Sequence, residues 1–360
     1  MLEHVPAASE MRQLEPLRQA VTTHPQDLTS ALRLAQGYLD IGRANADPRF
    51  VSYAEATLAP WLARDPADPA ALTTGATVLQ YLHRFDEALT LLNRALAEQR
   101  WNGQAWLTKA TILQVQGRFE EARQACLPLI RISGHLVALA CLSGVDSLTG
   151  SLGASYHALS AVFSDDPRLD RGLRVWILDQ LADMAERAAD VRSAESYLQR
   201  ALNASPRDGY SLAAYADLLL QEGRDAEVSQ RLRCMESQDN LLLRLAIAGH
   251  RHGGEDGQRW SAMYQARREA ALRDGDLTHM REQARFLLEV RGDAAAALEM
   301  AERNWQVQRE PADIRIYYAA AVAARDERAK QRVSAWMRQI KYEDRTIPTD
   351  TGASSRLVQQ

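Results

Sequence analysis

The feature that most constrains this chain is a small residue that returns about every 34 positions. Ala54, Ala88 and Ala122 are evenly spaced, and the series continues at Ser155, Ala194, Val228 and Ala297. Ala76 and Ala110 repeat the same interval, and Ala216 follows later in the chain. A period of this length, built from helix-forming residues, predicts stacked helical hairpins.

The composition agrees with this prediction. Of 360 residues, 46% are hydrophobic, which is above the range of disordered chains. No run alternates Val, Ile and Thr with polar residues, so we expect no strands. A solenoid core grows with the number of repeats, so this length needs no division into globular domains.

Charge and hydropathy limit the partners. The chain has 43 Lys and Arg against 47 Asp and Glu, and the two signs are interspersed. We therefore expect no nucleic-acid partner. No stretch of about 18 apolar residues occurs, so no membrane span is expected. The first residues lack a signal-peptide pattern. Two locations stay open: we expect a periplasmic protein if an export signal precedes the chain, and otherwise a cytoplasmic one.

The repeat resembles the tetratricopeptide repeat family, and its Ala, Arg and Leu bias suggests a bacterial type. The clearest copy consists of Trp106, Ala110, Leu113, Gly117, Phe119, Ala122, Cys126 and Leu129. The small residues let two helices approach closely, and Gly117 suits a helix end that needs a positive φ. The resemblance implies an all-α, right-handed superhelical solenoid of about eight or nine hairpins. First helices would line its concave wall.

The pattern divides the chain into four parts. We predict an N-terminal capping helix at 1–26, regular repeats at 27–235, degenerate repeats at 236–342 and a disordered tail at 343–360. Extra residues at 43–51 and near 165–172 are expected to form loops. Gly223 is expected to end a first helix as Gly117 does.

The concave positions of the first helices form the candidate binding surface. One stretch is neutral and hydrogen-bonding, and the next is acidic with aromatic residues, which suits a basic or extended peptide. The candidates are Thr73, Thr77, Gln80, Tyr81, Gln104, Thr108, Thr111, Gln114, Trp176, Asp179, Asp183, Glu186, Tyr210 and Asp217.

The most favoured function is a protein-binding scaffold that holds a peptide or partner protein in this groove. The alternatives are an assembly factor that oligomerises through its convex face or stack ends, and a regulator that senses a ligand or peptide. No nucleophile, metal or phosphate-binding motif is present, so we expect no enzyme, no catalytic residue, no cofactor and no metal. Asp179 and Asp183 share a helix face but lack a catalytic partner.

The cysteines leave one question open. Cys126 and Cys141 flank the turn at 133–134, which places them at one height on facing helices, so we expect neighbouring sulfurs. A disulfide needs Cα atoms closer than typical helix axes, which favours two buried thiols. His250 and His252 are interpreted as a cationic helix end before a glycine.

Overall fold

The computed structural model describes residues 8–45, 48–273 and 278–348. Within these ranges every regular element is a helix. The first ten are α1 (Ala8–Thr23), α2 (Leu28–Asn45), α3 (Pro48–Leu62), α4 (Pro69–Tyr81), α5 (Phe85–Glu98), α6 (Gly103–Val115), α7 (Phe119–Cys126), α8 (Leu129–Ile132), α9 (His135–Asp146) and α10 (Leu152–Val162). The others are α11 (Arg171–Arg187), α12 (Val191–Ala204), α13 (Gly209–Gln221), α14 (Asp225–Leu232), α15 (Asp239–His252), α16 (Glu255–Arg273), α17 (Met280–Glu289), α18 (Ala294–Trp305), α19 (Pro311–Ala323) and α20 (Glu327–Ile340).

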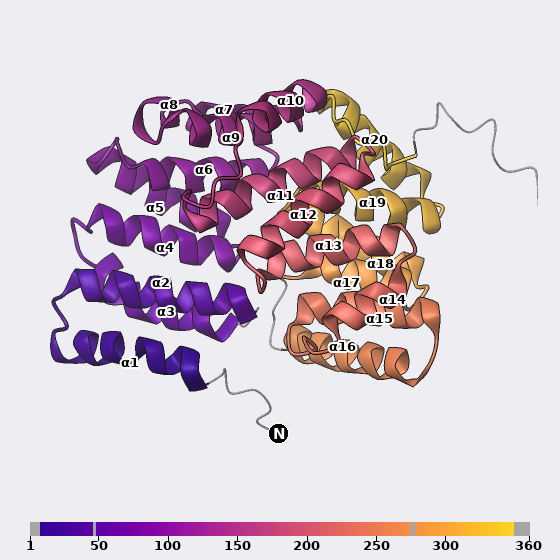
Figure 1. The fold of residues 1–360 in the computed structure, drawn as a ribbon, viewed down its shortest axis with the longest axis horizontal. Helices are drawn as coiled ribbons and strands as arrows, with labels where there is room; N and C mark the ends of the chain where they lie inside the picture. Colours follow the sequence, from indigo (N-terminus) through magenta and orange to yellow (C-terminus); the bar gives the residue numbers. More distant parts are fainter. Residues whose placement is uncertain (1–7, 46–47, 274–277, 349–360) are drawn as a thin grey trace, which may run out of the picture.

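The helices form nine consecutive hairpins, from α2–α3 to α19–α20, and α1 packs on the first of them. The short α8 extends the third hairpin after α7. The hairpins stack into a right-handed superhelix, which confirms the predicted fold. Figure 1 shows α1 to α9 rising along one side of the molecule, and α11 to α16 descending along the other.

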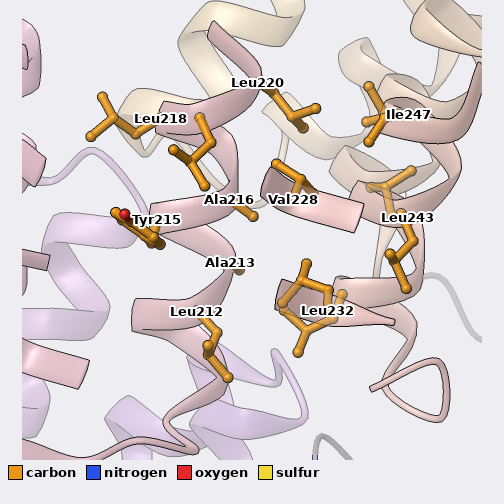
Figure 2. Close-up of a cluster of buried hydrophobic side chains, with 14 of the residues drawn as sticks. Leu212, Ala213, Tyr215, Ala216, Leu218, Leu220, Val228, Leu232, Leu243 and Ile247 are labelled. Atoms are coloured by element: carbon orange, nitrogen blue, oxygen red, sulfur yellow. The ribbon is translucent and has the colours of Figure 1, made fainter. Parts of the chain in front are cut away.

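The repeated small residues hold the two helices of each hairpin together. Ala88, Ala122, Ala194, Val228 and Ala297 are completely buried. Larger residues interlock around them. In Figure 2, Val228 and Leu232 of α14 lie between the side chains of α13 and those of α15. Each hairpin therefore completes its core with the next one.

The turns also agree with the prediction. Gly117 and Gly223 have φ of 75° and 69°. After Gly117, the N–H of Arg118 donates to the carbonyl of Leu113 at 2.8 Å, which is the bond that ends a helix through a left-handed residue. His83 occupies the same turn position with φ of 55°.

The first predicted loop is wrong in its extent. Residues 43–51 were expected to form a loop, but α2 continues to Asn45 and α3 begins at Pro48, while 46–47 lie outside the described residues. The extra residues lengthen both helices because nothing in their spacing forces an early stop. The second insertion does form a connection, at 163–170 between α10 and α11.

The second half of the superhelix returns to the first half along the turn edge of the hairpins. We call this line of contacts the seam. Its backbone part includes the N–H of Arg309, which donates to the carbonyl of Val115 at 2.8 Å. Figure 1 shows α20 returning toward α10. Other seam pairs include Arg43–Asp208, His83–Gln308, Leu152–Glu343, Glu186–Arg315 and Arg187–Arg345.

The expected disordered tail is ordered where the structure describes it. Residues 343–348 pack onto the seam, while 349–360 lie outside the described residues. The side chain of Asp344 is 1% exposed and accepts from Arg315 Nε at 2.9 Å. Ile347 is buried, and the Tyr318 hydroxyl donates to the Pro348 carbonyl at 2.9 Å. These contacts are specific but not periodic, so hydrophobic spacing does not reveal them.

Cys126 and Cys141 form a disulfide that joins α7 to α9, with Cα atoms 5.7 Å apart. The expectation of neighbouring sulfurs is confirmed, and the preference for two free thiols is wrong. Small neighbours such as Ala122 and Ala138, both buried, let these helices come closer than typical packing allows. Cys234 is exposed and free. A buried disulfide favours an oxidising compartment.

The disulfide closes a loop whose ends are 15 residues apart in sequence. Changing Cys141 to Ser should lower the free energy of unfolding by about 3 kcal/mol, because the crosslink restricts the unfolded chain. Urea denaturation of the variant and of the oxidised protein measures this difference. The Cys234→Ser variant is the control and should unfold like the unmodified protein; equal stability of all three proteins would contradict the assignment.

The docked tail gives a second prediction. Asp344→Ala removes the carboxylate that faces Arg315 and should cost about 2–4 kcal/mol of unfolding free energy, because a largely buried guanidinium loses a partner. The matched control is Asp166→Ala, whose partner Arg168 is 89% exposed; it should change stability by less than about 0.5 kcal/mol. Thermal denaturation checks both, and similar losses in the two variants would contradict the docking.

Candidate functional site

The concave side of the first helices contains the candidate residues, but the structure uses them in different ways. Thr73 and Thr108 are buried. The Thr73 hydroxyl donates to its own helix at Pro69 and accepts from Asn102. Thr77 and Thr111 donate to the carbonyls four residues earlier. The neutral stretch is thus largely occupied by its own hydrogen bonds.

The glutamines of that stretch are more accessible. Gln104 is exposed, and its amide donates to the Thr108 hydroxyl at 3.1 Å. Gln80 and Gln114 are half-buried on α4 and α6. An amide side chain both donates and accepts hydrogen bonds, so these glutamines have the chemistry to contact a peptide backbone.

Trp176 is a packing residue. It is half-buried and packs against two core clusters, one that spans the second to fourth hairpins and one in the fourth and fifth. With the Gln180 amide in its better orientation, the Trp176 indole N–H donates to that amide oxygen at 3.0 Å. Its position at a junction between hairpins explains its size, because large side chains fill the space around the small residues.

Arginines of the same chain neutralise most of the predicted acidic surface. Asp217 accepts from Arg244 at 2.6 Å and from Arg285 at 2.7 Å, and the two cations hold its pKa at about 2. Arg187 pairs with Asp183 at 2.8 Å, and Arg315 pairs with Glu186. Asp183, Glu186 and Asp217 therefore stabilise the superhelix, and they are not the bare acidic surface that the sequence suggested.

Asp179 is different, because no cation reaches it at ion-pair distance among the described residues. It accepts from the Ser211 hydroxyl at 2.8 Å. Burial raises its pKa to about 7; the hydrogen bond from Ser211 opposes this effect, and the nearby carboxylate of Asp208 adds to it. Burial therefore destabilises the ionised form of Asp179, and a nearby positive group would favour that form.

Tyr81 and Tyr210 have an unusual environment. They are 38% and 61% exposed. Nevertheless, burial within the superhelix raises the pKa of both hydroxyls, that of Tyr210 well above its ordinary value. Both rings are therefore accessible to solvent, while protein atoms surround their hydroxyls closely enough to raise the pKa.

The structure brings these three residues together with two that the sequence analysis missed. Arg43 at the end of α2 lies 3.4 Å from Asp208, the residue that caps α13. The charge of Arg43 acts on Tyr81 and Asp179. We call Arg43, Tyr81, Asp179, Asp208 and Tyr210 the inner cluster. Asp208 had a signal in the sequence, since it precedes a helix as a capping residue does; Arg43 had none, because the seam that places it is not periodic.

Neither a metal site nor a membrane span is found among the described residues. Among the described residues, no group of three or more His, Cys, Asp or Glu side chains converges as metal ligands do. No helix of the described part of the chain is both long and apolar enough to cross a bilayer. His250 and His252 lie in the last turn of α15 before Gly253, as expected for a cationic helix end.

The raised pKa of Asp179 predicts that the free energy of unfolding depends on pH. The Asp179 pKa is higher in the folded protein than in the unfolded chain, so its stabilising contribution is complete below pH 3.8 and is lost as the pH rises through 7. Asp179→Asn should therefore raise the unfolding free energy at pH 8 by on the order of 1–2 kcal/mol, and the gain should vanish near pH 4. Denaturation of both proteins at several pH values tests this; a constant difference across the series would contradict it.

Comparison with known proteins identifies the repeat. A tetratricopeptide repeat family model matches residues 81–132. No curated protein matches the sequence. The human IFIT1 dimer with PPP-AAAA is 13% identical, covers 89% of this chain and 80% of its own, and has a TM-score of 0.51. A monomeric IFIT1 mutant with Gppp-AAAA is also 13% identical, with coverages of 88% and 77% and a TM-score of 0.52. Residues 81–132 therefore match the tetratricopeptide repeat family, and the whole chain is similar in fold to these solved repeat structures.

Proposed function

We propose that this protein binds an extended segment of a partner protein at the inner cluster. The observation that carries the proposal is the exposure of the Tyr81 and Tyr210 rings, which are accessible although surrounding protein raises the pKa of both hydroxyls. Aromatic rings on a concave wall provide large contact area at a small entropy cost, so they are common anchors in protein interfaces.

The charges favour a segment with a positive group. Asp179 has no cation at ion-pair distance, and Asp208 shares only the longer contact with Arg43. A lysine or an amine placed between them would lower the Asp179 pKa and so gain affinity above neutral pH. The half-buried Gln80 and Gln114 are suited to bind the backbone of the same segment.

The fold supports this class of function. Tetratricopeptide folds generally mediate protein–protein interactions and are typically non-enzymatic scaffolds. A role in assembly through the convex face or the stack ends is the main alternative, and it needs no accessible tyrosine on the concave side. Regulation by a bound ligand or peptide is a further alternative.

RNA is a weaker candidate for this groove. The similar IFIT1 structures hold PPP-AAAA and Gppp-AAAA, and at 13% identity they share only the fold with this chain. In the present chain, Asp179, Asp208 and Glu310 surround Tyr210 or lie close to it. These carboxylates oppose the approach of phosphates, whereas phosphate binding is driven by Lys and Arg.

The test uses an array of extended decapeptides whose net charge ranges from about −3 to +3. Binding should increase with positive charge, and Tyr210→Ala and Asp179→Asn should each weaken it about tenfold or more. Fluorescence anisotropy measures the affinities. The matched control is Tyr53→Ala on the second helix α3, which changes a tyrosine that is 47% exposed outside the groove and should leave affinity unchanged.

Two results would contradict the proposal. One is the absence of any saturable binding across the array. The other is equal affinity of the Tyr210→Ala variant and the unmodified protein. Light scattering of the same samples then tests the alternative, because an assembly factor forms concentration-dependent oligomers.

A further inference from the structure

The junction between the seventh and eighth hairpins differs from the other junctions of the described stack. Elsewhere the second helix of a hairpin packs closely on the first helix of the next. Here the backbones of α16 and α17 scarcely approach each other. The rings of Tyr264 and Phe286 bridge them, with centroids 4.9 Å apart. The gap leaves room for something other than packed side chains.

This gap is a cavity of about 330 Å³. Phe286 and Leu287 form an apolar part of its wall, and Arg268, Glu269, Gln283 and Arg291 provide polar groups. The volume lies within the usual range of small-molecule sites, which is about 300–1,000 Å³. Such sites combine an apolar wall with a few polar groups that orient the ligand.

Arg268 is the residue that most strongly indicates a ligand at this cavity. It is 3% exposed and makes no ion pair with any described carboxylate, and its Nε has no hydrogen-bond partner. The other buried arginines are paired: Arg187 lies 2.8 Å from Asp183, and Arg244 lies 2.6 Å from Asp217. An unpaired buried guanidinium is costly, so its retention indicates that a partner comes from outside the chain.

Two neighbouring polar atoms also lack a hydrogen-bond partner. Gln283 Oε1 and the Tyr264 hydroxyl are buried without a hydrogen-bond partner. Tyr264 lies one turn before Arg268 on the same face of α16. The acids on the wall are already engaged, because Glu269 accepts from Gln265 at 2.8 Å and Asp293 caps α18 through the N–H of Ala296 at 3.0 Å.

We propose that this cavity binds a small organic carboxylate with an apolar body. The guanidinium of Arg268 binds the carboxylate through paired N–H donors, as arginine does in general. Phe286 and Leu287 contact the apolar body. A single negative charge fits better than a phosphate dianion, because Glu269 and Asp293 lie on the same wall.

Calorimetric titration with phenylacetate tests the site, and phenylacetamide serves as its neutral counterpart of similar shape. We expect saturable phenylacetate binding in the full chain, with phenylacetamide and inorganic phosphate weaker by about tenfold or more. Arg268→Met should abolish phenylacetate binding. The neighbouring Arg267→Met is the control, because Arg267 binds Asp239 and the backbone of residue 236 outside the cavity; it should preserve binding.

The melting temperatures of two variants distinguish a ligand-binding role of Arg268 from a structural one. Arg268→Met should leave the melting temperature of the ligand-free protein unchanged or raise it, because a desolvated charge is removed. Arg244→Met should lower it, because that change leaves Asp217 with one cation fewer. No saturable phenylacetate binding, equal binding of phenylacetamide, stronger binding of phosphate, or full binding by Arg268→Met would each overturn the proposal.

Discussion

The close approach of helices at small buried residues determines most of this structure. Where Ala88 or Ala122 meets its neighbouring helix, the backbones come close and the larger side chains interlock around them. Each hairpin then rotates slightly relative to the last one, and nine hairpins continue far enough for the ninth to meet the third, fourth and fifth. The seam is thus a consequence of curvature, and its contacts fix that curvature in turn.

The periodic features of this structure can be predicted from the sequence. The hairpins, their order and the turns at Gly117 and Gly223 follow from local spacing, because each repeat buries the same positions against its neighbours. The seam involves residues far apart in the chain, such as Glu186 and Arg315, which are 129 positions apart. Single pairs at such distances leave no pattern. The arginines that pair with Asp183, Glu186 and Asp217 were therefore not predictable from the sequence.

The buried arginines illustrate two uses of one side chain. Arg187 and Arg244 lie beside carboxylates and fix the relative positions of helices, because removing either partner leaves a buried charge. Arg268 has comparable burial but no such partner, and it lies where two hairpins stand apart. The same physical cost that makes the paired arginines structural makes the unpaired one a candidate for ligand binding.

The seam also limits what the inner cluster accommodates. Arg43 lies 3.4 Å from Asp208, so α2 and α13 are close at this level. A helix with its side chains is about 10–12 Å wide and needs a broad groove. An extended segment is thinner and exposes its backbone to side chains such as Gln80 and Gln114. Release of Arg43 from Asp208 would leave Asp208 free for a cationic partner. The partner that we propose is therefore a single extended chain, and Arg43 would compete with its positive group for Asp208.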